Sequence, residues 1–110
     1  MTDLAQKHPA ADGTAPRLTD DQVEELAQHV PAWSVQDGKL TREVQVKNFR
    51  EALALVNALG EVAEGENHHP DLLIHGWNHV RVELYTHTAH GLSENDFIMA
   101  AKFDQLIPTP

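Results

Sequence analysis

The segment from His79 to Thr86 alternates between apolar and polar side chains with the period of a β-strand. Its apolar residues fall on one face of the strand and its polar residues on the other: Val80, Val82 and Leu84 against His79, Arg81, Glu83 and Tyr85. A strand with one covered and one uncovered face is typical of an antiparallel sheet that packs against a single layer. The rest of the chain must therefore supply partner strands and the elements that cover the apolar face.

A hairpin is predicted earlier in the chain, around the dipeptide Asp37-Gly38. This dipeptide supplies the positive φ angles of a two-residue turn, and such a turn sets Val35 opposite Leu40 on one face. Arg42 interrupts the alternation of the second strand, so we expect that strand to lie near an edge of the sheet. A further strand is predicted after Pro70, before the alternating segment.

Three amphipathic segments predict helices, and each opens with a residue whose side chain can cap free backbone N–H groups. These helices start at Thr19, Asn48 and Ser93, and the second is expected to run to about Gly65. The resulting order is α-β-β-α-β-β-α. It favours an α+β fold in which helices cover one face of a four-stranded antiparallel sheet. The opposite face, or the edge of the sheet, is then free to pair with another subunit.

The chain has 110 residues, which is enough for one domain. Residues 1–17 mix Ala, Pro, Thr, Asp and Gly without an apolar period, so we expect a disordered N-terminal tail before a folded domain at 18–110. No secretory leader and no apolar run long enough to span a membrane is recognisable, and a cytoplasmic location is expected.

The chain is acidic, with a formal net charge of −9. Phosphate backbones and anionic membrane surfaces would repel such a chain, and no stripe of Lys and Arg is present to overcome the repulsion. We therefore expect neither nucleic acid nor a membrane as a partner. Cysteine is absent from the sequence, which excludes a disulfide framework, a thiolate nucleophile and a thiolate metal site.

Histidine is the unusual residue of this chain: there are eight, and six of them lie between His68 and His90. His68 and His69 lie in the connection between the long helix and the third strand, and His87 follows the fourth strand. The start of one strand lies beside the end of its antiparallel partner, so these three rings are expected to come together. Histidines at strand ends can equally be polar surface, and the residues alone leave both interpretations open.

Other candidates have simpler interpretations. Three further histidines fit no motif and are expected to be polar surface: His75, His79 and His90. Asp96 is explained by a capping box with Ser93, and Glu64 by a solvated helix surface. Trp77 fits either core packing or the wall of a flat pocket.

Converging imidazoles suit proton transfer near neutral pH, in which one ring acts as acid and another as base. A metal site is less favoured and none is expected, because no His-Glu-x-x-His helix is present and neighbouring histidines chelate one ion awkwardly. Nucleophilic catalysis is also disfavoured, since no Ser lies in a strand-turn-helix elbow. Dehydration suits a pair of acid and base imidazoles, because a hydroxyl leaves as water while a neighbouring N–H or C–H gives up its proton.

Several short motifs resemble the signature of the pterin-4a-carbinolamine dehydratase family. They are His68-His69-Pro70, Trp77-Asn78, Thr86-His87 and Gly91-Leu92-Ser93-Glu94-Asn95-Asp96-Phe97, with Glu64 four residues before the double histidine. The element order over residues 18–107 is also similar to that family's fold. In one departure, six residues separate Pro70 from Trp77, where the tighter form of the motif has five. The extra residue is expected to lengthen the strand or to add a bulge.

The resemblance implies a dehydratase that converts a 4a-hydroxytetrahydropterin, such as 4a-hydroxytetrahydrobiopterin, into quinonoid dihydropterin and water. It implies His68, His69 and His87 as the catalytic residues. His68 and His87 would share the acid and base roles, whereas His69 would mainly bind and orient the pterin. The pterin is the substrate, so no cofactor is implied.

The resemblance also implies supporting residues and partners. Further substrate contacts are implied at four positions: Asn67, Pro70, Trp77 and Thr86. Glu64 and Asp96 would hold or tune the imidazoles. An aromatic amino acid hydroxylase would act upstream, in pterin recycling, and the chain would form a homodimer or homotetramer.

Two alternatives come from other functional classes. The first is a non-catalytic protein of the dehydratase fold that serves as a dimerisation or assembly partner of another protein. The second is a metal-binding histidine module. The presence of all three motif histidines favours the enzyme.

Overall fold

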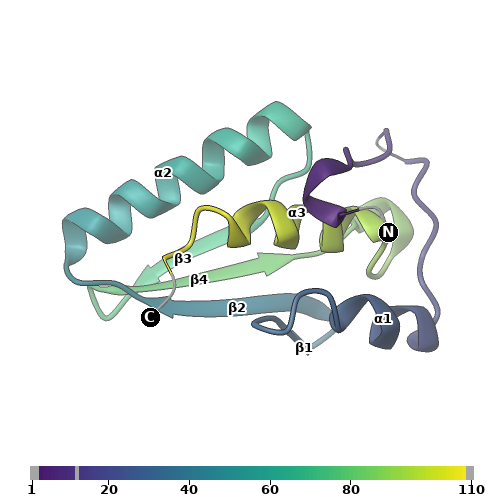
Figure 1. The fold of residues 1–110 in the computed structure, drawn as a ribbon, viewed down its shortest axis with the longest axis horizontal. Coiled ribbons are helices and arrows are strands. Elements are labelled where there is room, and N and C mark those ends of the chain that lie inside the picture. Colours follow the sequence, from purple (N-terminus) through teal and green to yellow (C-terminus); the bar gives the residue numbers. More distant parts are fainter. Residues whose placement is uncertain (1–2, 12, 109–110) are drawn as a thin grey trace.

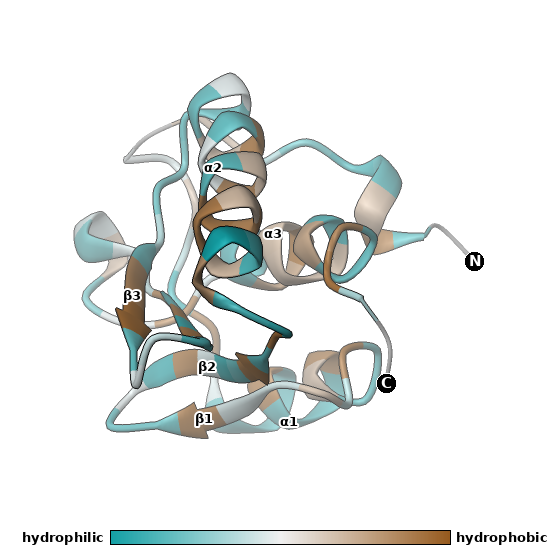
Figure 2. Cartoon of the chain, turned by 90° about the vertical axis from the view of Figure 1, so that its left-hand side faces the viewer, coloured by the Kyte–Doolittle hydropathy of each residue, from teal (hydrophilic) through white to brown (hydrophobic). Residues whose placement is uncertain are grey.

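The computed structural model describes residues 3–11 and 13–108, which form a layer of strands and a layer of helices (Figures 1 and 2). The helices are α1 (Asp20–Ala27), α2 (Phe49–Glu66) and α3 (Glu94–Asp104). The strands are β1 (Ser34–Gln36), β2 (Lys39–Gln45), β3 (Asp71–His75) and β4 (His79–Leu84). Two single turns of 3-10 helix are added, η1 (Leu4–Gln6) and η2 (His87–Ala89). This order confirms the α-β-β-α-β-β-α prediction.

The four strands form one antiparallel sheet in the order β1-β2-β4-β3. Asp37 and Gly38 close the β1–β2 hairpin with φ angles of 53° and 76°, and Val35 pairs with Leu40 as predicted. The β2–β4 pairing is long-range and joins the first hairpin to the second. β4, the strand with the clean alternation, therefore lies inside the sheet with a partner on each side.

The core lies between the sheet and the helices α2 and α3, which cover the same face (Figure 2). Val80, Val82 and Leu84 are fully buried on that face, as the alternation predicts. The helices contribute the opposing residues, among them Ala52, Leu55, Leu59, Phe97, Met99 and Phe103. The polar residues of β4 remain on the uncovered face.

The helix starts follow the predicted caps. Thr19 forms a capping box with Gln22, and the Asn48 side chain accepts a hydrogen bond from the backbone N–H of Glu51. Ser93 forms a second capping box with Asp96. Within the described ranges, every helix is too short or too polar to cross a bilayer.

The expectation that β2 lies near an edge of the sheet is confirmed. β2 is the neighbour of the edge strand β1, and its pairing with β1 ends at Thr41, so Arg42 lies where β2 itself borders the sheet. The Arg42 guanidinium pairs with the Asp104 carboxylate at the end of α3, and Trp33 Nε1 donates to the same carboxylate at 2.7 Å. Arg42 thus interrupts the alternation of β2 because its charge is paired with Asp104 on the side of the sheet that the helices cover.

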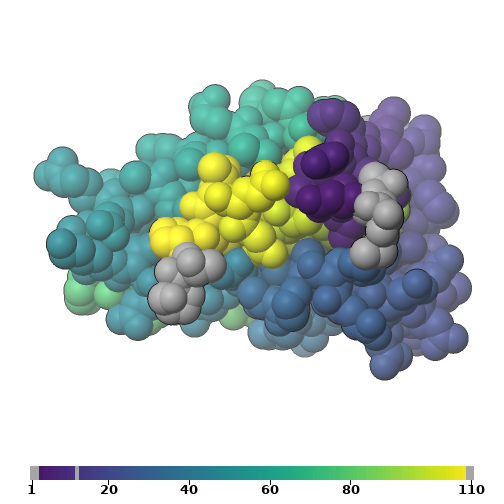
Figure 3. Space-filling model, viewed as in Figure 1, coloured from purple at the N-terminus to yellow at the C-terminus, as the bar shows by residue number. Residues whose placement is uncertain are grey.

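The expectation of a disordered N-terminal tail is wrong for the described part of residues 1–17. Leu4 is only 8% exposed and belongs to the core, and η1 packs on α3. Figure 3 shows this N-terminal segment lying directly against the last helix. Polar composition suggested disorder, but one buried leucine and polar contacts to distant residues hold the segment in place.

We expect Leu4→Ala to lower the free energy of unfolding by about 2 kcal/mol, because it removes buried methyl groups and leaves a cavity. Gln6→Ala, in the same turn but exposed, serves as the matched control and should change little. Chemical denaturation of the two variants measures the difference. Equal stability of both variants would mean that the N-terminal segment does not pack in solution.

Candidate active site

The end of α2 directs two histidines away from the helix. Asn67 adopts the left-handed conformation, with φ 54° and ψ 40°, and its N–H donates to the last helical carbonyls. Asparagine is one of the few residues other than glycine that takes this conformation readily. The chain therefore turns sharply, and His68 and His69 follow outside the helix, immediately before β3.

One cavity of about 250 Å³ lies where this connection meets the end of β4. It is lined by two short stretches of chain that are distant in sequence: Asn67, His68, His69, Tyr85, Thr86, His87 and Thr88. The β3–β4 pairing brings them together, because Asp71 at the start of β3 pairs with Glu83 near the end of β4. The three histidines expected to meet thus line the same cavity.

His68 is held from behind by a buried carboxylate. Its Nε2 lies 2.8 Å from Asp96 Oδ1, and the Asp96 side chain is completely buried while that of His68 is 13% exposed. The other carboxylate oxygen accepts from Thr86 Oγ1 at 2.8 Å and from the backbone N–H of Ser93 at 3.0 Å. A carboxylate only accepts hydrogen bonds, so Nε2 is the donor of this bond, and in the neutral ring the free lone pair is on Nδ1.

The other two histidines of the cavity are exposed. His69 Nε2 bonds to Glu64 Oε1 at 2.7 Å, with side chains that are 58% and 79% exposed. Such an exposed pair orients the ring but contributes little stability. His87 meets the ring of Tyr85 edge to face, with centroids 5.0 Å apart.

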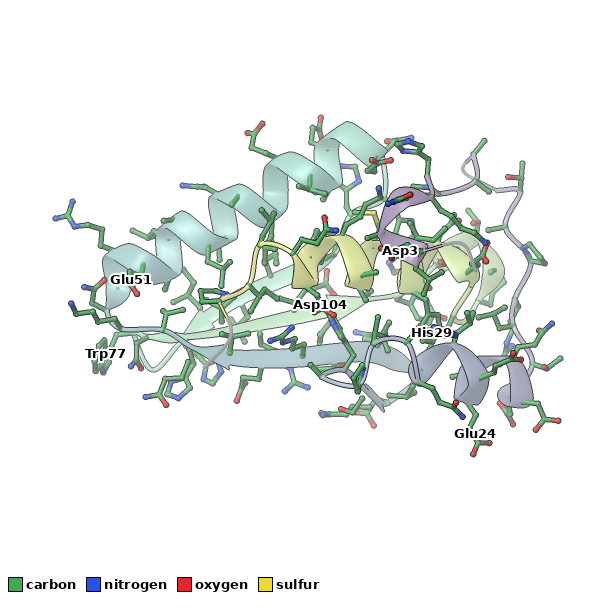
Figure 4. All side chains as sticks on the ribbon, viewed as in Figure 1. Asp3, Glu24, His29, Glu51, Trp77 and Asp104 are labelled. Atoms are coloured by element: carbon green, nitrogen blue, oxygen red, sulfur yellow. The ribbon has the colours of Figure 1, made fainter. Side chains whose placement is uncertain are left out.

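The structure does not bring Trp77 to this cavity. Trp77 lies in the turn between β3 and β4, at the opposite end of the hairpin from His87, and its side chain is 61% exposed (Figure 4). The strands pair without a bulge, from Asp71 opposite Glu83 to His75 opposite His79, so the bulge, one of the two expected consequences of the extra residue, is absent from this pairing. The turn holds three residues, 76–78, with positive φ at Gly76 and Trp77.

Two cavity residues were missed by the sequence analysis. Tyr85 and Thr88 line the cavity, whereas Pro70 is not among its lining residues. The signal for Tyr85 was present, because residues two apart on an extended strand point to the same side, and Tyr85 precedes His87 by two. No comparable signal marks Thr88, which lies in the irregular turn η2.

Of the other histidines, two form a separate group on the uncovered face of the sheet. His75 Nε2 bonds to Glu43 Oε1 at 2.7 Å, and the rings of His75 and His79 stack with centroids 5.2 Å apart. Among the residues that the structure describes, no three His, Asp or Glu side chains are grouped closely enough to hold a metal ion. The groups available at the cavity are therefore imidazoles and their carboxylate partners.

Comparison with known proteins agrees with the motifs. The family described as pterin 4 alpha carbinolamine dehydratase has a model that matches residues 16–106. The chain belongs to the pterin-4a-carbinolamine dehydratase family. The match covers the sheet, all three α-helices and the cavity, and it begins after the segment that carries η1.

Similar proteins carry the same family name. A protein of Methylococcus capsulatus is 50% identical over 96 residues, covering 86% of this chain and 83% of its own. One of Rubrobacter xylanophilus is 44% identical over 108 residues, covering 96% and 100%. Both are named, provisionally, pterin-4-alpha-carbinolamine dehydratase.

A crystal structure shares the fold. A protein of Brucella melitensis described as a transcriptional coactivator/pterin dehydratase superimposes with a TM-score of 0.77 at 31% identity. The superposition covers 84% of this chain and 99% of the Brucella chain. The α+β fold is therefore the one found in this family.

We expect Asp96→Asn to move the proton of the His68 ring from Nε2 to Nδ1. An amide has a single accepting oxygen, so with that oxygen kept by Thr86 and Ser93 its NH₂ group faces His68 Nε2. Nitrogen-15 NMR of the imidazole reports the tautomer directly. Glu64→Gln, which alters the exposed partner of His69, is the matched control; an unchanged His68 tautomer in Asp96→Asn would contradict the assigned hydrogen bond.

Proposed function

We propose that this protein dehydrates a 4a-hydroxytetrahydropterin to quinonoid dihydropterin and water by histidine acid/base catalysis. The observation that carries the proposal is the meeting of three imidazoles at one cavity, with one of them bonded to a buried carboxylate. Membership of the family supplies the substrate class. The alternative interpretation of these histidines as polar surface does not explain why Asp96 is buried against His68.

The reaction needs two proton transfers. The bond between C4a and the hydroxyl oxygen breaks, the oxygen takes a proton and leaves as water, and N5 loses its proton as the C4a–N5 double bond forms. No electrons are exchanged with another molecule, so the chemistry requires no redox cofactor. Acid and base groups that change charge near neutral pH are sufficient.

His68 is assigned as the base and His87 as the acid. Asp96 keeps the proton of His68 on Nε2, which leaves the Nδ1 lone pair to accept the N5 proton, and the buried carboxylate stabilises the positive charge that then develops. His87 is exposed and is free to protonate the departing hydroxyl, which must leave toward solvent.

The remaining cavity residues bind and orient the pterin. His69 and Asn67 present polar groups at the mouth of the cavity. The Thr86 hydroxyl donates to Asp96 and contacts Ser93 Oγ at 2.8 Å. Its role is therefore to hold the carboxylate, although Thr86 also lines the cavity. Tyr85 provides the flat aromatic wall that the sequence analysis expected from Trp77.

A 4a-hydroxytetrahydropterin is the product of a pterin-dependent hydroxylation. An aromatic amino acid hydroxylase is therefore the upstream enzyme in this proposal, and pterin recycling is the role. The coactivator function in the description of the Brucella protein belongs to that protein. The complete set of cavity histidines in this chain favours the enzyme over an assembly partner.

The decisive experiment generates the carbinolamine in a hydroxylase reaction and follows its dehydration by absorbance, with and without this protein. Acceleration over buffer is expected. His68→Ala and His87→Ala should each lower kcat by about 10²–10⁴-fold, the usual contribution of a general acid or base. His29→Ala, two residues after the end of α1 and not among the residues that line the cavity (labelled in Figure 4), is the matched control and should retain wild-type kcat. Wild-type protein that gives no acceleration would rule out the enzyme.

The role of Tyr85 predicts a separate effect on binding. Tyr85→Ala should raise KM by about tenfold through loss of aromatic contact, while kcat stays within about threefold of wild type. Tyr85→Phe keeps the ring and serves as the control. A KM that is the same in both variants would show that the aromatic ring does not contact the pterin.

A further inference from the structure

The described N-terminal residues 3–11, here called the strap, lie outside the region matched by the family model, which begins at residue 16. The strap runs over the start of α3 and reaches the end of α2 (Figures 1 and 3). Leu4 anchors it in the core. Its polar contacts fall on residues beside the two partners of the His68–Asp96 hydrogen bond.

The first group of contacts is made to α3. Asn95, immediately before Asp96, is only 4% exposed. Its Oδ1 accepts from the backbone N–H of Ala10 at 2.8 Å, and its Nδ2 donates to the carbonyl of Ala10 at 3.2 Å. Lys7 Nζ donates to Glu94 at 3.0 Å in the same turn. The reciprocal pair with a buried amide fixes both the position and the direction of the first turn of α3.

The second group of contacts is made to the end of α2. His8 Nδ1 donates to the Glu66 carboxylate at 2.9 Å, two residues before His68. Lys102 Nζ lies 3.6 Å from Glu66 Oε2 and donates to the strap carbonyl of Ala5 at 2.8 Å. The hydrogen bond from His8, together with Lys102 and against the opposing effect of burial, holds the pKa of the Glu66 carboxyl below its usual value of 4.5.

The strap thus bridges the two chain segments that the His68–Asp96 hydrogen bond joins behind the cavity. We propose that it is a positioning element for dehydration, with Asn95 as its principal positioning residue. It holds the start of α3 and the end of α2 at the separation that keeps His68 Nε2 on Asp96. Neither Asn95 nor the strap lines the cavity, so their effect passes through His68. This inference rests on the proposed function for its kinetic test only.

The test uses the full chain with Ala10→Pro, which removes the N–H that donates to Asn95. Ala10→Gly keeps both backbone groups and is the matched control. Ala10→Pro is expected to lower kcat about tenfold with KM within about twofold of the control, because a small misplacement of a catalytic group slows chemistry more than binding. In a His68→Ala background, Ala10→Pro should have no further effect on kcat, as expected for two residues that act through one interaction.

A structural measurement separates failure of the strap from failure of the proposed function. Nitrogen-15 NMR of the His68 ring should report a weakened Nε2–H bond to Asp96 in Ala10→Pro but not in Ala10→Gly, whether or not the protein is an enzyme. His8→Ala removes an exposed side chain whose ion pair contributes little to folding, and it should give a smaller change of the same kind, with about a twofold loss of kcat. Identical His68 signals and kcat in Ala10→Pro and Ala10→Gly would overturn the proposal. Equal losses of kcat with and without His68 would overturn it as well.

Discussion

The buried carboxylate of Asp96 is the group on which the cavity depends. It joins three segments: the connection after α2 through His68, the end of β4 through Thr86, and the start of α3 through Ser93. Burying an unpaired charge would cost free energy of folding. The Asp96 carboxylate is tolerated because three donors surround it at a helix N-terminus. Any displacement of one segment leaves part of this charge without a partner. Fold stability and cavity geometry are therefore maintained by the same interaction.

The three cavity histidines differ in how firmly they are held. His68 is largely buried and fixed by Asp96, whereas His69 and His87 are exposed. A fixed ring suits a proton acceptor that must stay aligned with one substrate nitrogen, and its positive charge is stabilised where the carboxylate is shielded from water. An exposed ring suits a donor to a group that departs as water. The unequal burial supports the proposed division of roles.

The sequence predicted the elements and the meeting of the histidines because both depend on local signals, namely side-chain alternation, capping residues and a tight turn. The residues themselves identified Asp96 only as a helix cap, and the family resemblance implied that it holds an imidazole. Capping geometry carries no information about a partner 28 residues away. The strap was predicted as disordered because composition reports mean polarity. It does not report that Asn95 matches the backbone of Ala10 or that Leu4 fills a place in the core.

The misplaced aromatic residue has a simple origin in strand geometry. Spacing in sequence suggested that Trp77 stays with the histidines, but a hairpin separates its turn from its open end by the full length of both strands. Because β3 and β4 pair without a bulge from Asp71 to His75, Trp77 lies in the turn at 76–78, away from the cavity. The ring that accompanies His87 is the one two residues before it, on the same side of the chain. The register of the β3–β4 pairing, more than the spacing of the motif, thus determines which aromatic residue lines the cavity.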